Sequence, residues 1–491
     1  MSSSMTIDDC MQRFDSLIIN AGLDAKPHQR DGVKWAIENE KGDVKGGIIA
    51  DEMGLGKTII SIGMIYANPV ERTLIVLPVA LLQQWQKAIF NITGITPLLF
   101  HGSKRNRITF DQFASHPIVI TTYDVVTLSS QKDNSLLHTI RWSRIIYDEA
   151  HHLRNSNTTR HEACLALTTN IAWAVTGTPV QNRVSDFYSI CRILGFQEHM
   201  YRTAEKDQRN HFIDTHILKR TRVEVGVILP PLSIQDIVVE WTSATEKQLA
   251  IDIHKNLKFS NASLVDDVCD KPVAYEANSF VLVSMMRARQ ACIMPEMMFK
   301  KTSRKKLDSV SSKLGKVLST ILERKDNGAG KLVFCHYIQE IDRIKKCLVE
   351  GGVEHVNTYD GRNSGAKNAF DKADVLILQI QTGCEGLNLQ EHFSEIYFVS
   401  PHWNPAVEEQ AIARCYRIGQ QRPVNVYRFV MDNFNEDKEG EDKDKDKDKD
   451  KDKDKDKDKD KDVETINIEE YVKQVQNFKK VTCGAVMQKN I

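Results

Sequence analysis

The sequence lacks several features that define other classes of protein. Its ten cysteines include no CxxC pair, and the two closest are Cys335 and Cys347, so zinc ribbons and RING fingers are not expected. It has no run of 18 apolar residues, so we expect no segment that spans a membrane. Residues 1–10 lack the apolar core of a signal peptide, which predicts an intracellular protein. The formal net charge is zero, so a nucleic acid would have to bind a local basic groove.

Short apolar runs alternate with helical stretches in two parts of the chain. The runs are rich in valine and isoleucine and do not alternate with polar residues, which is typical of strands buried on both faces of a parallel sheet. The first set comprises residues 47–50, 74–77, 118–122, 145–147 and 172–175, and the second set comprises 331–335, 353–357, 375–380, 396–399 and 424–429. The predicted fold class is therefore α/β, with two doubly wound parallel-sheet lobes and helical insertions between them.

A glycine-rich turn connects the first of these strands to an apolar helix. Residues 48–58 are I-I-A-D-E-M-G-L-G-K-T, and this strand–turn–helix setting is what a phosphate-binding P-loop requires. Lys57 would reach the β- and γ-phosphates of ATP, and the Thr58 hydroxyl would bind Mg²⁺. The alternative is a chance Gly-Lys-Thr sequence in a loop. We expect the loop to bind ATP through Asp51, Glu52, Met53, Gly54, Leu55, Gly56, Lys57 and Thr58.

An acidic pair follows a second buried strand, about 90 residues after the P-loop. Asp148 would hold Mg²⁺ through water, and Glu149 would orient and polarise the water that attacks the γ-phosphate. Acidic residues at the end of a strand more often cap a helix. The P-loop upstream favours the catalytic interpretation.

Two arginines in the second lobe are the candidate arginine fingers. Arg414 and Arg417 are three residues apart, so on a helix they share one face. Guanidinium groups that point across a cleft neutralise charge on a transferring phosphate, whereas such a pair alone more often forms surface salt bridges. We predict that ATP lies between the lobes, and that Lys57, Asp148, Glu149, Arg414 and Arg417 are the catalytic residues.

The order of the motifs resembles that of the Swi/Snf-type ATPases of helicase superfamily two, in a compact form without accessory domains. The resemblance covers residues 26 to about 487 and implies that both lobes are RecA-like. Among the strings that carry it are P-H-Q-R-D-G-V-K-W (27–35), D-E-M-G-L-G-K-T (51–58), D-E-A-H-H-L-R-N (148–155), T-G-T-P-V-Q-N (176–182), T-G-C-E-G-L-N-L (382–389) and R-I-G-Q (417–420).

The resemblance also implies roles for residues outside the P-loop. Gln29 would lie by the adenine, and Gln410 would meet ATP together with the two arginines. The DNA phosphates would be contacted by Thr121, Thr122, Thr382 and Gly383. Coupling of hydrolysis to movement would involve Thr176, Gly177 and Thr178. The basic strip at residues 101–107 is either a further DNA contact or a solvated loop.

We expect six parts along the chain. A run of ten Lys-Asp pairs near the end has no apolar residue to offset its ordering entropy, so we expect it to be disordered. The parts are an N-terminal extension (1–25), an ATP-binding lobe (26–240) with a helical insertion from about residue 184, a helical linker (241–310), a second lobe (311–432), the Lys-Asp insertion (433–464), and a brace helix with a tail (465–491).

The expected function is that of a DNA-dependent ATPase that uses ATP and Mg²⁺. It would translocate on double-stranded DNA as a monomeric motor and displace or remodel DNA-bound proteins, such as nucleosomes or transcription factors, without separating strands. Two alternatives remain open: a strand-separating DNA or RNA helicase, and an ATP-gated DNA-binding scaffold with negligible turnover. The family implies a nucleus, with the cytoplasm or a viral factory as other locations, and no membrane partner is expected.

Overall fold

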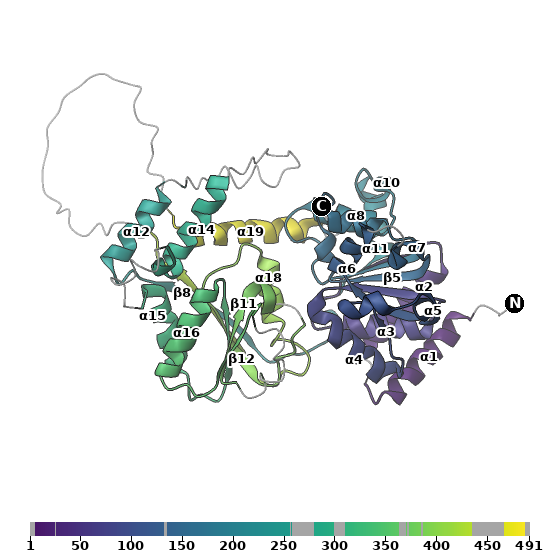
Figure 1. The fold of residues 1–491 in the computed structure, drawn as a ribbon, viewed down its shortest axis with the longest axis horizontal. Coiled ribbons are helices and arrows are strands. Elements are labelled where there is room, and N and C mark those ends of the chain that lie inside the picture. Colours follow the sequence, from purple (N-terminus) through teal and green to yellow (C-terminus); the bar gives the residue numbers. More distant parts are fainter. Residues whose placement is uncertain are drawn as a thin grey trace, which may run out of the picture.

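The chain folds into two α/β lobes that are joined by a connector and by a long C-terminal helix (Figure 1). This computed structural model describes residues 5–24, 26–131, 135–255, 257, 279–298, 310–362, 370, 373–383, 386–434 and 466–486. The expected Lys-Asp insertion lies almost wholly outside these residues, as do Cys384 and Glu385. No described helix is long and apolar enough to cross a bilayer.

Seven parallel strands form the sheet of the first lobe in the described chain, in the order β3-β4-β2-β5-β6-β1-β7. The order reverses direction along the sheet, which defines a doubly wound fold. The strands are β1 (Gly46–Ile49), β2 (Thr73–Leu77), β3 (Leu98–Leu99), β4 (Ile118–Thr122), β5 (Trp142–Asp148), β6 (Thr169–Val175) and β7 (Ile217–Leu218). All five strands expected in this lobe are present, and the two-residue β3 and β7 were too short to predict.

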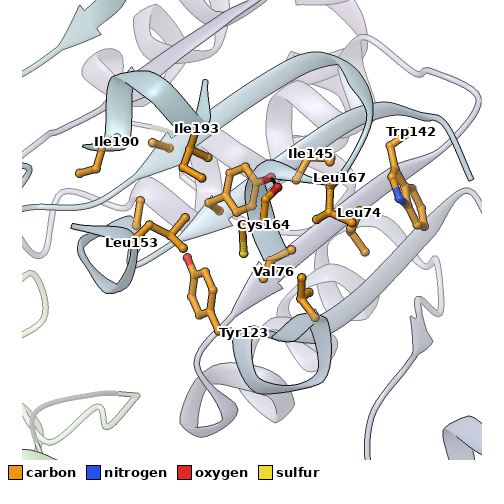
Figure 2. Close-up of a cluster of buried hydrophobic side chains, with 14 of the residues drawn as sticks. Leu74, Val76, Tyr123, Trp142, Ile145, Leu153, Cys164, Leu167, Ile190 and Ile193 are labelled. Atoms are coloured by element: carbon orange, nitrogen blue, oxygen red, sulfur yellow. Dashed lines mark hydrogen bonds between the residues drawn. The ribbon is translucent and has the colours of Figure 1, made fainter. Parts of the chain in front are cut away.

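Helices cover both faces of the first sheet because alternate strand residues face opposite ways. On one face Ile49, Ile75 and Ile146 pack against α1 (Ile7–Asn20), α2 (Pro27–Lys41), α3 (Lys57–Ala67) and α4 (Leu82–Thr93). On the other face the cluster in Figure 2, which includes Leu74, Val76 and Ile145, packs against the remaining helices. These are α5 (Phe110–Ser115), α6 (Tyr123–Ser130), α7 (Leu136–Thr139), α8 (Thr159–Leu165), α9 (Val184–Ile193), α10 (Glu198–Tyr201) and α11 (Lys206–His216).

The second lobe has a parallel sheet of six described strands in the order β10-β11-β9-β12-β13-β8. They are β8 (Leu232–Val239), β9 (Gly330–Cys335), β10 (Val356–Tyr359), β11 (Val375–Gln379), β12 (Phe393–Phe398) and β13 (Val424–Met431). Its helices are α12 (Ala244–His254), α14 (Ser279–Ile293), α15 (Ser312–Glu323), α16 (Ile338–Glu350), α17 (Ile380–Gly383), α18 (Pro405–Ile412) and α19 (Ile468–Val486). The expected α/β fold with two doubly wound lobes is confirmed.

One expected domain boundary is wrong. The first lobe was expected to extend to residue 240, but β8 pairs with β13 over eight residues in the sheet of the second lobe. Its sequence, LSIQDIVV, interrupts the apolar run with polar residues because β8 is an exposed strand at the edge of that sheet. The connector between the lobes is therefore residues 219–231, which follow β7.

Helix α19 is anchored in the second lobe and extends toward the first, near α8 (Figure 1). Its anchor is Glu469, which is 1% exposed and accepts hydrogen bonds from Ser400 Oγ at 2.7 Å and the Met431 backbone N–H at 2.8 Å. It also pairs with the fully buried ammonium of Lys313. The two buried charges therefore hold the start of α19 against α15 and β13.

We expect Glu469→Ala to lower the free energy of unfolding by about 3–5 kcal/mol, because it leaves the Lys313 charge buried without its partner. Denaturant unfolding followed by circular dichroism measures the loss. Glu470→Ala is the matched control, since Glu470 is the next residue of α19 and is only half-buried. Equal losses in the two variants would contradict the assignment of this ion pair as the anchor.

Candidate active site

The P-loop (residues 51–58) turns sharply between β1 and α3. Gly54 and Gly56 have φ angles of +91° and +85°, a left-handed conformation that favours glycine. A Cβ atom on Gly56 would lie 2.3 Å from the Gln29 side-chain nitrogen, so a larger residue would have to displace Gln29 from the loop. Lys57 begins α3 directly after Gly56. The backbone thus has the geometry to place N–H groups around a phosphate at a helix N-terminus.

Lys57 lies across the mouth of this loop. Its Nζ donates to the carbonyl oxygens of Asp51 at 2.8 Å and Glu52 at 3.4 Å. Burial lowers the pKa of Lys57, and the negative charges of Glu149, Asp51 and Asp148 partly offset this shift. The lysine of the P-loop and the acidic pair therefore lie close enough to act on one ligand.

Gln29 also contacts the P-loop. Its side-chain nitrogen donates to the Leu55 carbonyl at 3.1 Å, and His28 Nε2 lies 2.9 Å from the same oxygen. Gln29 is 4% exposed. The structure therefore places Gln29 at the edge of the expected nucleotide site, where its amide fixes the loop; its contact with adenine stays a prediction.

Two arginines that the sequence analysis missed hold the acidic side chains of the P-loop. Arg220 donates to both oxygens of the fully buried Asp51 carboxylate. Arg222 pairs with Glu52 in the same way from two residues further along the connector. The side chains of Asp51 and Glu52 therefore bind the two arginines of the connector, whereas their backbone carbonyls accept hydrogen bonds from Lys57. The run K-R-T-R directly after a strand was the available signal.

Asp148 and Glu149 lie at the end of β5, beside the P-loop. Trp85 Nε1 donates to Asp148 Oδ2 at 2.6 Å. Burial, followed by the charge of Glu149, raises the pKa of Asp148 to about 7. Burial also raises the pKa of Glu149, but the hydrogen bond and charge of His151, with the charges of Lys57 and Arg414, hold it below its usual range. The Glu149 carboxylate is therefore ionised. A cation beside Asp148 would favour the ionised form of that carboxyl.

Glu149 has a left-handed backbone, with φ of 49° and ψ of 50°. A non-glycine residue in this region costs about 1–3 kcal/mol, and such strain is common at functional sites. The turn projects the Glu149 side chain away from the strand and lets η3 (Ala150–Leu153) begin at once. His151 Nδ1 then lies 3.2 Å from Glu149 Oε2. The strain is consistent with a side chain that is aimed at a reaction centre.

A series of polar contacts leads from Glu149 to the second lobe. The same Nδ1 of His151 lies 3.3 Å from Thr176 Oγ1, which also accepts from the Thr178 backbone N–H at 3.2 Å. Gln181 Nε2 donates to Thr178 Oγ1 at 3.1 Å, and Gln181 Oε1 accepts from Asn404 Nδ2 of the second lobe at 3.1 Å. The predicted coupling residue Gly177 lies between Thr176 and Thr178. A Cβ atom at this position would crowd the side chains of Met53 and Lys57.

The second lobe brings its predicted arginines to the same place. A Cβ atom on Gly54 would lie 3.2 Å from Arg417 Cβ, so Arg417 packs directly against the P-loop. The positive charge of Arg414 acts on both Lys57 and Glu149. A cavity of about 380 Å³ opens at the seam, lined by residues of both lobes that include Glu52, Thr178 and Tyr416, and none of the five predicted catalytic residues lines it. Arg417 therefore meets the P-loop across the seam. The guanidinium groups of Arg414 and Arg417 donate to Leu387 and Asn388 of their own lobe, and their contact with a phosphate stays a prediction.

The residues at the seam fit ATP with Mg²⁺. Within the described chain, Arg417 Nε and Gln410 Nε2 are buried polar atoms without a hydrogen-bond partner, and a phosphate would supply acceptors for both. Burial, with the charge of Arg414, lowers the pKa of Arg417 to about 10, so an anion would stabilise its charged form. Thr58 in the first turn of α3 and Asp148 offer the oxygen ligands that Mg²⁺ prefers.

The structure does not support all of the predicted DNA contacts. Thr121 and Thr122 are 0% and 1% exposed. Thr121 Oγ1 donates to the Phe100 carbonyl, and Thr122 Oγ1 caps α6 by accepting from the Val125 N–H. The prediction that these hydroxyls contact DNA phosphates is wrong, because β4 is internal to the sheet and buries its last residues. Thr382 and Gly383 end α17 after β11, and their role stays a prediction.

Comparisons with known proteins identify a family for both lobes. The model of the SNF2-related domain matches residues 28–297, and that of the helicase conserved C-terminal domain matches residues 312–419. A probable global transactivator of Orgyia pseudotsugata multicapsid polyhedrosis virus is 28% identical over 83% of this chain and 86% of its own length.

Cellular relatives are longer than this chain. A putative ATP-dependent helicase/translocase of Bacillus subtilis is 27% identical, and an ISWI chromatin-remodeling complex ATPase of Saccharomyces cerevisiae is 26% identical, each over 84% of this chain. The chain spans 47% and 39% of their lengths. The SWI2/SNF2 ATPase core of Sulfolobus solfataricus, solved in complex with double-stranded DNA, is 22% identical over 83% of this chain and 88% of its own, with a TM-score of 0.39.

The hydrogen bond from Trp85 generates a prediction about pH. Trp85→Phe removes a donor to ionised Asp148, which raises the pKa of this carboxyl further above its usual value. Because Mg²⁺ binds the ionised form, the acid side of the pH profile for Mg²⁺-dependent ATP turnover should move to higher pH by about half a unit to one unit. Trp142→Phe, which loses a buried indole bond to the Leu137 carbonyl, is the control. Identical profiles for Trp85→Phe and the parent chain would contradict the prediction.

Proposed function

This chain belongs to the SNF2-related family of ATP-dependent, helicase-like proteins, and from that premise we propose that it is a DNA-dependent ATPase that translocates on double-stranded DNA without separating the strands. The observation that carries the proposal is the seam itself. The P-loop of one lobe lies against Arg417 of the other, and Arg414 acts on both Lys57 and Glu149. A nucleotide bound there touches both lobes, so its hydrolysis changes how the lobes sit together.

Each residue at the seam has a separate chemical task. Lys57 and the P-loop N–H groups bind the triphosphate, and Thr58 with Asp148 holds the Mg²⁺ that neutralises charge on it. Glu149 orients the attacking water and polarises it, and its ionised state suits this task. Arg414 and Arg417 stabilise negative charge on the transferring phosphate. Gln410 places its amide in the same region from α18.

The hydrogen-bond chain through Thr176, Thr178 and Gln181 would report the nucleotide state to the second lobe. It starts at the residue that positions water and ends at Asn404, whose side chain also caps α18 through the Ala406 N–H at 3.1 Å. Helix α18 carries Gln410 and leads directly to Arg414. We therefore assign the coupling role to this series of hydrogen bonds, in which Thr176, Gly177 and Thr178 form the middle part.

DNA would bind through both lobes. Candidates are Thr382 and Gly383 in the second lobe and the turn η2 (Ser103–Arg107) in the first, where Lys104 and Arg107 are exposed. The substrates would be DNA-bound proteins such as nucleosomes or transcription factors, a proposal that the similarity to the yeast chromatin-remodeling complex ATPase supports. We propose a monomeric motor that acts on DNA in the nucleus. The alternative locations are the cytoplasm and a viral factory, which would suit a protein like the viral relative.

The ATPase assignment predicts that Lys57→Ala and Glu149→Gln abolish turnover and leave DNA binding intact. The first change removes a phosphate contact and the second removes the carboxylate that acts on water, a loss of about 10²–10⁴-fold in rate. Phosphate release with and without plasmid DNA measures turnover, and fluorescence anisotropy of a labelled duplex measures binding. Glu162→Gln, on the exposed surface of α8, is the control.

The same assays separate the alternatives. ATP turnover at the parental rate in either site variant would refute the site, and turnover that is negligible in the parent chain would favour the scaffold. Displacement of a triplex-forming strand reports translocation on duplex. Release of one strand from a tailed duplex in step with ATP turnover would show a strand-separating helicase instead.

The coupling assignment predicts that Asn404→Ala separates turnover from movement. The change removes the contact with Gln181 and the cap of α18, and leaves Lys57, Glu149 and both arginines in place. We expect DNA-stimulated ATP turnover to fall less than about fivefold and triplex displacement per ATP to fall at least tenfold. Asn404→Asp tests the contact with Gln181 alone, since it keeps the acceptor that caps α18 and loses the donor to Gln181. Parallel losses of turnover and displacement in Asn404→Ala would argue against a coupling role.

A further inference from the structure

The connector between the lobes passes beside the P-loop before it enters the second lobe. It begins at residue 219, after β7, and reaches β8 at Leu232. The sequence at residues 219–222 is K-R-T-R. The two arginines of this run are two residues apart, and they contact different parts of the molecule.

The hydrogen bonds of Arg220 within the described residues are all to the first lobe. Its guanidinium pairs with Asp51, and its Nη1 donates to the His28 carbonyl at 2.6 Å. Both partners belong to the elements that build the P-loop side of the site. Arg220 therefore fixes the shape of the loop whatever the second lobe does.

Arg222 contacts both lobes. On the first lobe its backbone N–H donates to Glu52 Oε2 at 2.7 Å, and its guanidinium pairs with the same carboxylate. On the second lobe its Nη1 donates to the Tyr416 carbonyl at 3.3 Å, and its Cζ lies 4.7 Å from the centre of the Tyr416 ring. A planar guanidinium can donate to a carboxylate and stack on an aromatic face at once, which a lysine ammonium cannot do.

Tyr416 lies between the two arginines that meet the nucleotide. The sequence at residues 414–417 is R-C-Y-R, so a change in the position of Tyr416 moves Arg414 and Arg417 with it. On the other side, the Glu52 carbonyl accepts from Lys57 Nζ at 3.4 Å. The contacts of Arg222 thus connect the arginines of one lobe to the P-loop lysine of the other.

We propose that Arg222 is a positioning residue that holds Arg414 and Arg417 over the P-loop in the closed arrangement of the lobes. We call the contacts among Arg222, Glu52 and Tyr416 the Arg222 bridge. The inference rests on the proposed ATPase function and adds to it the contact that stabilises closure. The bridge acts through Tyr416 and touches no phosphate, so it affects the assembly of the site and leaves its chemistry unchanged.

The size of the effect follows from the contacts with Tyr416. Arg222 is about one-fifth exposed, so its stacking is only partly desolvated. A partly desolvated cation–π contact corresponds to about tenfold in an equilibrium for closure, and the hydrogen bond to the Tyr416 carbonyl is kept when the ring is removed. Since only closed molecules present the arginines to the phosphate, we expect kcat to fall about tenfold and the KM for ATP to change less than about threefold when Tyr416 loses its ring.

The experiment is a double-mutant cycle of Arg222→Ala and Tyr416→Ala, with DNA-stimulated kcat and KM for ATP as the first readout. If the bridge exists, the double variant should lose no more kcat than the worse single variant. Tyr416→Phe keeps the ring and should recover most of what Tyr416→Ala loses, whereas Arg222→Lys should not replace the arginine. Arg202→Ala is the matched control, because Arg202 lies over the Tyr188 ring within the first lobe.

The second readout is closure itself. Donor and acceptor dyes on the exposed positions 87 and 346 report the distance between the lobes by energy transfer, with a non-hydrolysable ATP analogue added. The fraction of closed molecules should fall about tenfold relative to open ones in Tyr416→Ala and in Arg222→Ala, and no further in the double variant.

The outcomes separate the two levels of inference. Additive losses of kcat, or closure that is equal in Tyr416→Ala and the parent chain, would overturn the Arg222 bridge. A parent chain that closes on the analogue through the bridge and hydrolyses no ATP would keep the bridge and refute the proposed function.

Discussion

The structure depends on the charges that the two lobes bring together where they meet. Lys57, Asp148 and Glu149 lie in the first lobe, and Arg414 and Arg417 approach from the second. Each such charge costs several kcal/mol to take out of water unless it is paired. The protein pairs part of this set internally, and the raised pKa of Asp148 and the lowered pKa of Arg417 show where pairing is incomplete. A triphosphate with a divalent cation supplies the missing charges of both signs, so its binding and the closure of the lobes favour each other.

The order of the strands explains why these groups are neighbours. β5, β6 and β1 lie side by side in one parallel sheet, so their carboxyl ends meet at one edge. The P-loop follows β1, the acidic pair ends β5, and Thr176 follows β6. The polar contacts from Glu149 through His151 to Thr176 therefore join the ends of adjacent strands, and they need no special loop. The second lobe faces the same edge, which is why α18 can reach Gln181.

The sequence predicted what depends on local pattern and missed what depends on distant contacts. The P-loop, the acidic pair and the strands in the middle of each sheet follow from glycine spacing and unbroken apolar runs. Arg220 and Arg222 could not be assigned, because their partners Asp51 and Glu52 are about 170 residues away in sequence. Thr121 and Thr122 were assigned wrongly for a related reason, since burial of a hydroxyl at the end of a strand depends on the neighbouring β3. The sheet of β8 likewise depends on pairing with β13, which no local pattern specifies.

The two links across the seam hold the same segment at its two ends. Asn404, bonded to Gln181, stands just before α18, and Tyr416, bonded to Arg222, stands just after it. Gln410 and Arg414 lie between these two points. A segment fixed at one end could pivot and still keep its contact, whereas a segment fixed at both ends can move only with the whole lobe. We therefore expect movement of the second lobe to break or keep both links together. The arginines would then have one position when the lobes are closed and another when the lobes are open. In the proposed function, such two-state behaviour would turn a small change at a phosphate into a step of a whole lobe.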